Sequence, residues 1–439
     1  MLKRKIEAQI ELWRENHSGT ALLVSGARQV GKTFILHHFI ETHYESSIEL
    51  DLIADRQLAD ALNSANTAAD IMTLITAAAN VNLKPQHSAI FIDEVQAAPN
   101  LVTQIKYLVQ EYPYDFIFSG SLLGVELENI DSLPVGFVHN LRLYPCDFEE
   151  FCWAAGVSSG ALNLVKNTIA EGKPVVEYLH TKLMQLFATY LVVGGMPAAT
   201  SEYFATTNVQ QVQTIQRDIV TLYKADISKY APTDRRLVIR NIYDLIPSEL
   251  AKENKRFRFS SIEQVKRFAA VADEFLWLTS AGVAISVPQV TAPIAPLVLM
   301  EDRAKFKFFS SDVGLLTSMF PQNTAVDILS GAPTANLGGV YENFVAQELV
   351  AHGFSPRYFS NRKVGELDFL VEKPDGDLLA LEVKSGAGYR THRALDKALA
   401  TEGYGIDDAY VVGPSNVESD GRVTYVPIYA VGLWPRSTR

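Results

Sequence analysis

Short apolar runs alternate with amphipathic stretches over residues 1–155, and this alternation predicts how the first part of the chain folds. The apolar runs are typical of buried strands, and they span Leu22–Ser25, Ile48–Leu52, Ala89–Asp93, Asp115–Ser119 and Val138–Leu143. The stretches between them have helical spacing, as over Phe34–Tyr44. Strands that alternate with helices form a parallel sheet with helices on both faces. We therefore expect an α/β domain over residues 1–155, with ligands at the carboxyl ends of its strands.

Residues 156–330 have a different pattern. The stretch up to about residue 230 is helical, and Arg235–Ser248 and Ser261–Leu278 continue that pattern. Two strand-like runs follow, Ala281–Val287 and Leu297–Met300. Helices followed by a β-wing describe a winged helix, so we expect a helical and winged-helix-like domain here.

A third, small α/β domain is expected over residues 331–439, with a β-hairpin at its centre. Two alternating runs, Gly365–Val371 and Leu378–Lys384, flank a turn that contains Pro374 and Gly376. Proline suits the first corner of a type I turn, and glycine suits the left-handed position that closes a three-residue loop. The turn chemistry therefore sets the register of the hairpin.

Counting back from this turn brings four charged residues to one face of the hairpin. Asp368 is expected opposite Glu382, and Glu366 opposite Lys384, while the other face is apolar. Two carboxylates at this spacing repel each other unless a cation lies between them. Lys384 or a metal ion can supply that cation.

A phosphate-binding loop is predicted directly after the first strand. The segment Gly26-Ala27-Arg28-Gln29-Val30-Gly31-Lys32-Thr33 fits the pattern G-x-x-x-x-G-K-[ST]. The glycines let successive backbone N–H groups point at phosphates, and the next helix presents its positive end. Lys32 adds a charge, and the Thr33 hydroxyl is a ligand for Mg²⁺. The strand–loop–helix setting favours an ATP and Mg²⁺ site over a glycine-rich turn with no ligand.

Two further strand ends carry polar residues at the same edge of the predicted sheet. Asp93 can hold Mg²⁺ through water opposite Thr33, and Glu94 can orient and deprotonate the attacking water. Ser119 or Ser121 can contact the γ-phosphate or that water, although a plain strand-end turn explains both serines equally well. The residues expected to act in hydrolysis are Lys32, Glu94 and Ser119, and those expected to bind the metal are Thr33 and Asp93.

The chain as a whole is acidic, which excludes a basic surface spread over the molecule. Its 439 residues carry a formal net charge of −11, with a pI of about 5.4. The segment Arg235–Arg267 departs from this average, because nine basic residues against four acidic ones give +5. Such a patch can neutralise DNA phosphates, or it can pack on the acidic first domain.

The sequence also disfavours a disulfide framework, a zinc site, a signal peptide and a membrane span. Cys146 and Cys152 form no disulfide framework, and they lack histidines at the spacing of a zinc site. The first sixteen residues lack the apolar core of a signal peptide. Thr279–Met300 carries no charge, but three prolines interrupt it, which favours a hairpin and loop over a membrane span. We expect a cytoplasmic protein with no membrane partner.

The carboxylates of the hairpin resemble the site of restriction-endonuclease-like nucleases. Asp368, Glu382 and Lys384 form a D…E-x-K arrangement. In that family the two acids bind Mg²⁺ and the lysine helps to activate water. Glu342, in the helical run Val340–Leu349, lies where the family often carries another acid. The alternative is an ion-paired hairpin in a nuclease-like domain that has lost activity.

A longer series of motifs resembles a family of bacterial and archaeal AAA-type ATPases with a restriction-endonuclease-like C-terminal domain. In chain order the series comprises Gly26–Thr33, Ile92–Gln96, Ser119–Ser121, Leu143–Pro145, Phe148–Phe151, Gly194–Pro197, Ser311–Leu315, Tyr341–Asn343, Glu366–Asp368 and Glu382–Gly386. One position departs from the family, which has Gly-Arg where this chain has Gly136-Phe137. Arg142, a neighbouring subunit or another domain can supply the missing charge.

The resemblance implies a Mg²⁺-dependent ATPase whose nucleotide state moves the middle domain. Two alternatives stay open: an ATP-regulated DNA nuclease, and a low-turnover switch that changes affinity for DNA or a protein partner. Phe137 in place of arginine favours the switch slightly.

Overall fold

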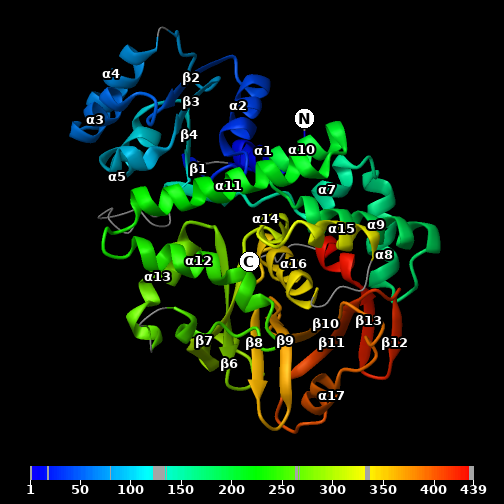
Figure 1. Cartoon of the computed structure of the whole chain (residues 1–439). Helices are drawn as coiled ribbons and strands as arrows, with labels where there is room; N and C mark the ends of the chain where they lie inside the picture. The colour runs from blue at the N-terminus through cyan, green and yellow to red at the C-terminus, as the bar shows by residue number, and fades with distance from the viewer. Residues whose placement is uncertain are drawn as a thin grey trace. The chain divides into compact units, whose positions relative to one another are not determined.

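The computed structural model describes residues 2–16, 19–79, 81–121, 134, 136–262, 265, 267–331 and 337–434 (Figure 1). The chain divides into two compact units. The N-terminal unit comprises residues 4–144 and 280–282, and the C-terminal unit comprises residues 1–3, 145–279 and 283–439.

A five-stranded, all-parallel sheet forms the centre of the N-terminal unit. Its strand order is β2-β3-β4-β1-β5. The strands are β1 (Ala21–Ser25), β2 (Ser46–Asp51), β3 (Ser88–Asp93), β4 (Asp115–Gly120) and β5 (Val138–Arg142). The helices are α1 (Ile6–Asn16), α2 (Lys32–His43), α3 (Arg56–Ser64), α4 (Ala68–Ala78), the 3₁₀ turn η1 (Val95–Ala97) and α5 (Pro99–Glu111). The prediction of five strands and a parallel sheet is confirmed.

Both faces of this sheet are buried, as expected for a parallel sheet between helices. Leu23, Ile92 and Phe118 share one apolar cluster with residues of α3, α4 and α5. Leu22 and Ile117 point to the opposite face and are also fully buried. The three central strands, β3, β4 and β1, are therefore mostly apolar and buried, whereas the edge strands β2 and β5 carry exposed polar residues.

The C-terminal unit combines a helical part with a large sheet. Its helices are α7 (Phe148–Ala154), α8 (Ser159–Ala170), α9 (Glu177–Val193), α10 (Pro197–Thr206), α11 (Val209–Tyr230), α12 (Arg236–Leu250), α13 (Ala272–Ser280), α14 (Val313–Ser318), α15 (Asn323–Ser330), α16 (Gly338–Ala351) and α17 (Arg393–Leu399). Short 3₁₀ turns are η3 (Phe259–Ser261), η4 (Phe268–Ala270), η5 (Leu297–Met300) and η6 (Ile428–Leu433).

Eight strands form the sheet of the C-terminal unit, in the order β12-β13-β11-β10-β9-β8-β6-β7 (Figure 1). They are β6 (Ala284–Val290), β7 (Glu301–Ser310), β8 (Arg357–Asn361), β9 (Gly365–Glu372), β10 (Leu378–Val383), β11 (Ile406–Gly413), β12 (Glu418–Asp420) and β13 (Val423–Pro427). One sheet thus joins strands from both sides of the expected boundary at residue 330.

The strands expected to form a wing belong to this sheet. β6 pairs antiparallel with β7, as in a hairpin, but its other edge pairs with β8. The hairpin is therefore the margin of the eight-stranded sheet and not a free wing. The run Leu297–Met300, expected as a strand, is the 3₁₀ turn η5, and the second strand of the hairpin begins at Glu301.

Aromatic packing explains why Ser261–Leu278 does not form the single helix expected there. Within the described part of this range, the structure has η4 and most of α13 in place of one continuous helix. Phe268 lies 5.5 Å from Phe306 of β7, and Phe275 lies 4.8 Å from the same ring, measured between centroids. The helical spacing of these side chains reflects a shared aromatic cluster, and tertiary packing overrides the local pattern.

The predicted register of the C-terminal hairpin is confirmed. Leu379 pairs with Val371, and Leu381 pairs with Phe369. The turn is closed by a hydrogen bond from the Lys373 N–H to the Asp377 carbonyl, at 2.9 Å. Extended by one residue beyond the pair Leu381–Phe369, the same register sets Asp368 opposite Glu382.

A buried polar contact joins the helical part of the C-terminal unit to the strand end after β7. The carboxylate of Asp312 accepts hydrogen bonds from the N–H groups of Gly195 (2.6 Å) and Leu315 (2.9 Å). The Gly195 carbonyl accepts from the N–H of Cys146 at 2.7 Å. Burial raises the pKa of Asp312 to about 6, although the backbone N–H groups oppose this rise. Two motif segments, around residues 195 and 312, therefore serve packing in this unit.

Gly195→Ala is expected to destabilise the C-terminal unit strongly. A Cβ at this position would lie 2.0 Å from the Cys146 carbonyl oxygen, so the backbone must move. Overpacking of this kind costs about 1–3 kcal/mol, and occasionally more, so thermal unfolding should shift to lower temperature. Gly405→Ala is the matched control, because a Cβ there meets nothing within 4 Å. Equal unfolding temperatures for the two variants would contradict the argument.

Candidate functional site

The segment after β1 forms a tight loop that leads directly into α2. Three of its residues have positive φ angles: Gly26 (152°), Gln29 (66°) and Gly31 (96°). A side chain at Gly26 would lie 2.2 Å from the Leu143 carbonyl oxygen, so only glycine fits there. The N-cap of α2 is Gly31, which has no side chain to satisfy the first N–H groups of the helix. The loop therefore presents backbone donors at the carboxyl edge of the sheet.

Arg4 supports this loop from outside the motif. Its guanidinium donates hydrogen bonds to the carbonyls of Val30 (3.1 Å) and Tyr144 (2.7 Å), and its side chain is buried. Sequence reasoning did not find this residue, because a single arginine near the N-terminus carries no motif.

Lys32 is the first residue of α2, and its ammonium group is folded back onto the loop. Nζ donates to the carbonyls of Gly26 (3.0 Å) and Ala27 (2.9 Å), and the residue is 5% exposed. Burial lowers the pKa of Lys32 to about 8, against the raising effect of Glu94 and Asp93. Within the described part of the chain, the ammonium thus has carbonyl acceptors but no carboxylate in direct contact, and it is poorly stabilised for a buried cation.

The end of β3 meets the start of α2 at Asp93. The Thr33 hydroxyl donates to Asp93 Oδ2 at 2.5 Å, and the Ser119 hydroxyl donates to Asp93 Oδ1. The Glu94 N–H also donates to Oδ1, at 3.0 Å. The structure therefore brings together both residues expected to bind the metal. Ser119 is fully buried and acts on Asp93, so its hydroxyl orients that carboxylate.

Glu94 is held by the neighbouring strand end and by η1. The Ser121 hydroxyl lies 2.8 Å from Glu94 Oε2, and the Ser121 N–H donates to the same oxygen at 3.2 Å. Gln96 Nε2 donates to it at 2.5 Å. Glu94 itself has a left-handed backbone, with φ of 54°. Gln96 was not foreseen as a partner, although it lies two residues from Glu94.

Arg142 lies near the loop, at the end of β5. A Cβ built on Gly282 would lie 3.3 Å from an Arg142 guanidinium nitrogen and 3.3 Å from the Ala27 N–H nitrogen. Phe137, which stands where an arginine was expected, is half-buried, with the Lys106 ammonium 5.4 Å from its ring centroid. Arg142 is therefore a local cation within reach of the same loop.

A second cluster lies in the C-terminal unit, around the ammonium of Lys307 on β7. Nζ lies 2.8 Å from Glu366 Oε1, 2.9 Å from Glu342 Oε2 and 3.3 Å from Asp368 Oδ1. A second ammonium, from Lys255, lies 2.7 Å from Glu342 Oε1. Burial alone would lower the pKa of Lys307, but the three carboxylates raise it well above its ordinary value. Lys307 therefore stays charged although it is fully buried.

Glu382 and Lys384 form their own ion pair beside this cluster. Lys384 Nζ lies 2.8 Å from Glu382 Oε1, and Asp368 Oδ2 accepts a hydrogen bond from the Val383 N–H at 2.9 Å. Burial, with the charge of Asp368, raises the pKa of Glu382 to about 8. Among the described residues, no set of three or more His, Cys, Asp or Glu side chains is placed to hold a metal ion.

The four residues predicted for the second site, Glu342, Asp368, Glu382 and Lys384, therefore lie in or beside one cluster, but the residue at its centre was not foreseen. The only sequence signal for Lys307 is a lysine inside the apolar run Phe306–Phe309.

The basic segment 235–267 is partly neutralised within the C-terminal unit. Arg235 pairs with Glu274 at 2.7 Å, Lys252 pairs with Glu249, and Lys255 pairs with Glu342. Lys266 and Glu263 lie outside the described residues. Four further arginines of the segment are exposed: Arg240, Arg256, Arg258 and Arg267.

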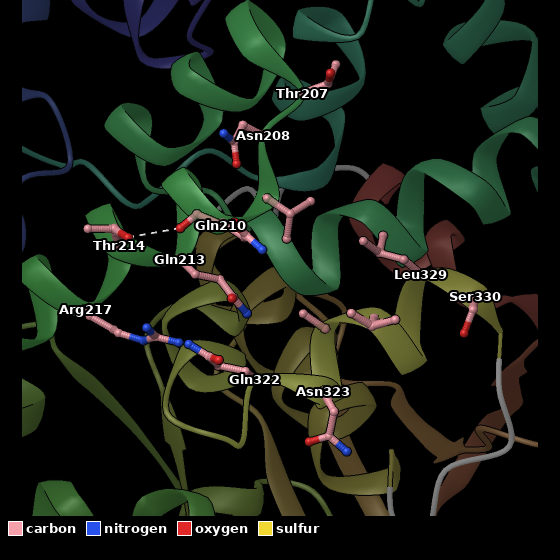
Figure 2. A pocket seen from close by; sticks show the side chains of 13 residues that line it. Thr207, Asn208, Gln210, Gln213, Thr214, Arg217, Gln322, Asn323, Leu329 and Ser330 are labelled. Atoms are coloured by element: carbon pink, nitrogen blue, oxygen red, sulfur yellow. Dashed lines mark hydrogen bonds between the residues drawn. The ribbon is translucent and has the colours of Figure 1, made fainter.

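A groove of about 950 Å³ runs beside the first turns of α11 and along α15 (Figure 2). Amide side chains dominate its polar lining, and Arg217 is its charged residue. Figure 2 shows Arg217 and Gln322 pointing toward each other from the two sides. Among the described residues that line it there is no carboxylate, histidine or cysteine, so this lining has no groups for acid–base or metal chemistry.

Residues 18–152 match the family described as an AAA domain. Residues 184–325 and 337–431 match two families described as domains of unknown function, DUF8612 and DUF4143. The first match, together with the parallel sheet and its loop, supports an AAA-type P-loop ATPase in the N-terminal unit. No curated protein matches the sequence.

Solved structures resemble the chain weakly. The Walker-type ATPase PABY2304 of Pyrococcus abyssi is 16% identical, with a TM-score of 0.42, over 73% of this chain and 96% of that one. A single-residue variant of Thermotoga maritima RuvB is also 16% identical, with a TM-score of 0.29, over 70% and 90%. Cdc6p from Pyrobaculum aerophilum is 11% identical, with a TM-score of 0.24, over 75% and 96%. In the described ranges, none of the helices combines the length and hydropathy that a membrane crossing requires.

Lys32→Met is expected to stabilise the nucleotide-free protein at pH 7. The pKa of Lys32 falls from 10.5 when unfolded to about 8 when folded, so the folded state disfavours the charged form. Removing that charge should raise stability by on the order of 3 kcal/mol. The gain should shrink between about pH 8 and 10.5, where the folded wild type loses its proton before the unfolded chain does.

Scanning calorimetry across this pH range measures the effect. Lys84→Met is the control, because Lys84 is exposed. A loss of stability at pH 7, or a gain that does not change with pH, would contradict the assignment.

Proposed function

We propose that the N-terminal unit binds ATP with Mg²⁺ and hydrolyses it. One observation carries the proposal: the P-loop lysine and threonine and the two acids at the end of β3 converge at one sheet edge through the Thr33–Asp93 contact. The AAA domain match over residues 18–152 supports the same class of enzyme.

The loop from Gly26 to Thr33 fits a triphosphate. Its backbone donors and the uncapped start of α2 suit an anion, because helix N-termini attract negative charge. Lys32 has two carbonyl acceptors, which phosphate oxygens can replace with a stronger, charge-assisted contact. The negative charge of the bound ligand then raises the pKa of Lys32 back toward its ordinary value.

The donor set also fits Mg²⁺. This ion keeps several waters and takes few protein oxygens when it binds with a nucleotide. We assign the direct ligand to the Thr33 hydroxyl and the water-mediated contact to Asp93, which Ser119 orients from within the core. Bound Mg²⁺ supplies charge stabilisation to the phosphoryl oxygens.

Glu94 is assigned the role of base toward the attacking water. Its carboxylate is engaged by Ser121 and Gln96, so it must leave at least part of this contact before it can accept a proton. The contact with the attacking water, predicted for Ser119 or Ser121, is therefore assigned to Ser121, in place of the role in hydrolysis expected for Ser119. Arg142 is assigned to the γ-phosphate, in the role for which an arginine was expected at Phe137.

The alternative of an ATP-regulated nuclease receives less support. Cleavage of that kind needs a divalent cation between Asp368 and Glu382. Asp368 is in contact with the Lys307 ammonium, and Glu382 is paired with Lys384. We therefore propose that the C-terminal unit responds to the nucleotide state as a binding module. DNA contact through the exposed arginines of segment 235–267 is a candidate role for it.

The ATPase proposal predicts opposite defects for two substitutions. Lys32→Ala should abolish ATP binding, because the loop loses its charged contact. Glu94→Gln should retain ATP binding but lower turnover by about 10²–10⁴-fold, because the amide cannot accept the proton of the attacking water. Isothermal calorimetry with ATP and Mg²⁺ and a phosphate-release assay measure the two effects.

Glu41→Gln is the control for the loss of a carboxylate, because Glu41 lies on the exposed side of α2. Wild-type turnover by Glu94→Gln would remove Glu94 from the mechanism. Undiminished ATP binding by Lys32→Ala would remove the loop from the site.

A further inference from the structure

The C-terminal carboxylate cluster is built around an internal ammonium group. Three carboxylates from α16 and β9 lie within 3.3 Å of Lys307 Nζ. We propose that Lys307 is a built-in cation, which takes the place of a divalent metal ion in this nuclease-like cluster and keeps metal out. Replacing its ammonium with a neutral group should uncover a divalent-cation site.

The surroundings of Lys307 favour an ammonium group over a small divalent ion. Besides the carboxylates, its Nζ lies 5.3 Å from the ring centroid of Tyr358 and 5.9 Å from that of Phe369. Aromatic faces attract organic cations, whereas Mg²⁺ and Mn²⁺ require a complete shell of oxygen ligands. The pocket therefore matches the side chain that fills it.

Charge counting leads to the same conclusion. The cluster holds three negative charges, from Glu342, Glu366 and Asp368. It also holds two positive charges, from Lys307 and Lys255. A divalent cation added to this set would lie beside Lys307, where two like charges repel strongly in a buried environment. Metal binding thus requires that the lysine leave or be absent.

The fold leaves Lys307 no alternative position. It is fully buried, and its strand β7 is tied to β6 through the pairs Ser286–Phe308 and Val287–Lys307. The flanking side chains of Phe306 and Phe308 are also buried, in the aromatic cluster with Phe275. Withdrawal of the ammonium would require movement of a whole strand.

Removing the ammonium leaves three carboxylates from two elements facing one spot. Glu366 and Asp368 on β9 lose their ion pair with Lys307, whereas Glu342 on α16 keeps its contact with Lys255. Their oxygens lie 2.8–3.3 Å from the position of Nζ, so they must close in to reach the shorter distances of a divalent-ion shell. Lys307→Met keeps the length and much of the volume of the side chain but lacks the charge. This variant should therefore bind one Mn²⁺ in a site that the wild-type lysine blocks.

The experiment measures Mn²⁺ binding to the full-length protein without nucleotide, by electron paramagnetic resonance. All proteins compared carry Asp93→Asn, which removes the candidate metal carboxylate of the N-terminal unit. Lys307→Met should bind one Mn²⁺ per chain at least about tenfold more tightly than its Lys307 parent, because the like charge beside the ion is gone. Addition of Asp368→Asn should abolish this gain, and Lys307→Arg should show none, because it keeps the charge.

Two results would overturn the proposal. One is a folded Lys307→Met variant, with the circular dichroism of its parent, that gains no Mn²⁺ site. The other is a parent protein that binds one Mn²⁺ in a manner abolished by Asp368→Asn, and this comparison stands even if Lys307→Met fails to fold. Neither result bears on ATP binding by the N-terminal unit, because every comparison is made without nucleotide.

Discussion

Each unit of this protein buries an ammonium group, and the partners given to that group decide what the surrounding site can do. Lys32 has two neutral carbonyls in direct contact, and its pKa is lowered by burial. Lys307 has three carboxylates in contact, and its pKa is raised well above the ordinary value. A buried cation without a counter-ion destabilises the fold until an anion binds beside it. A cation that is already paired with carboxylates gains little from a further anion. The first cluster is therefore open to a phosphate ligand, and the second is closed.

This difference explains why two clusters of similar composition call for different assignments. Both combine a lysine with acids at the ends or faces of strands, and the sequence predicted a Mg²⁺ site at each of them. In the N-terminal unit, Asp93 and Thr33 contact each other, and the lysine contacts the loop and not the acid. In the C-terminal unit, the lysine stands among the acids themselves. A matching motif is thus not enough to assign a role to a cluster. The assignment depends on which atom lies at the centre of the cluster.

Local chemistry allowed the sequence to predict a large part of the fold. The five parallel strands follow from apolar runs, and the hairpin register follows from the turn formed by Pro374 and Gly376, because both depend on nearby residues. The convergence of Lys32, Thr33 and Asp93 could be anticipated for a related reason: parallel strands end at one edge. These predictions needed no knowledge of distant contacts.

Most of the failures involve contacts between distant segments, although the contact of Gln96 with Glu94 is a local one that was also missed. Lys307 comes from a strand more than thirty residues before its nearest carboxylate partner in sequence, and no spacing rule connects them. The Phe268 and Phe275 pattern indicated a helix but serves an aromatic cluster.

The placement of β6 and β7 also changes how the chain can act. The hairpin was assigned to a wing because its pairing with β8 cannot be read from its own residues. A wing is a projecting element that can enter a nucleic-acid groove, but here β6 has strands on both sides. Its partner β7 carries Lys307, so the hairpin and the carboxylate cluster are one structural unit. Any movement that displaced this hairpin would pull the ammonium from the acids and deprive Glu366 and Asp368 of their ion pair, while Glu342 would keep Lys255. Breaking a buried ion pair is strongly destabilising, so the contacts of Lys307 oppose displacement of β7 from the sheet.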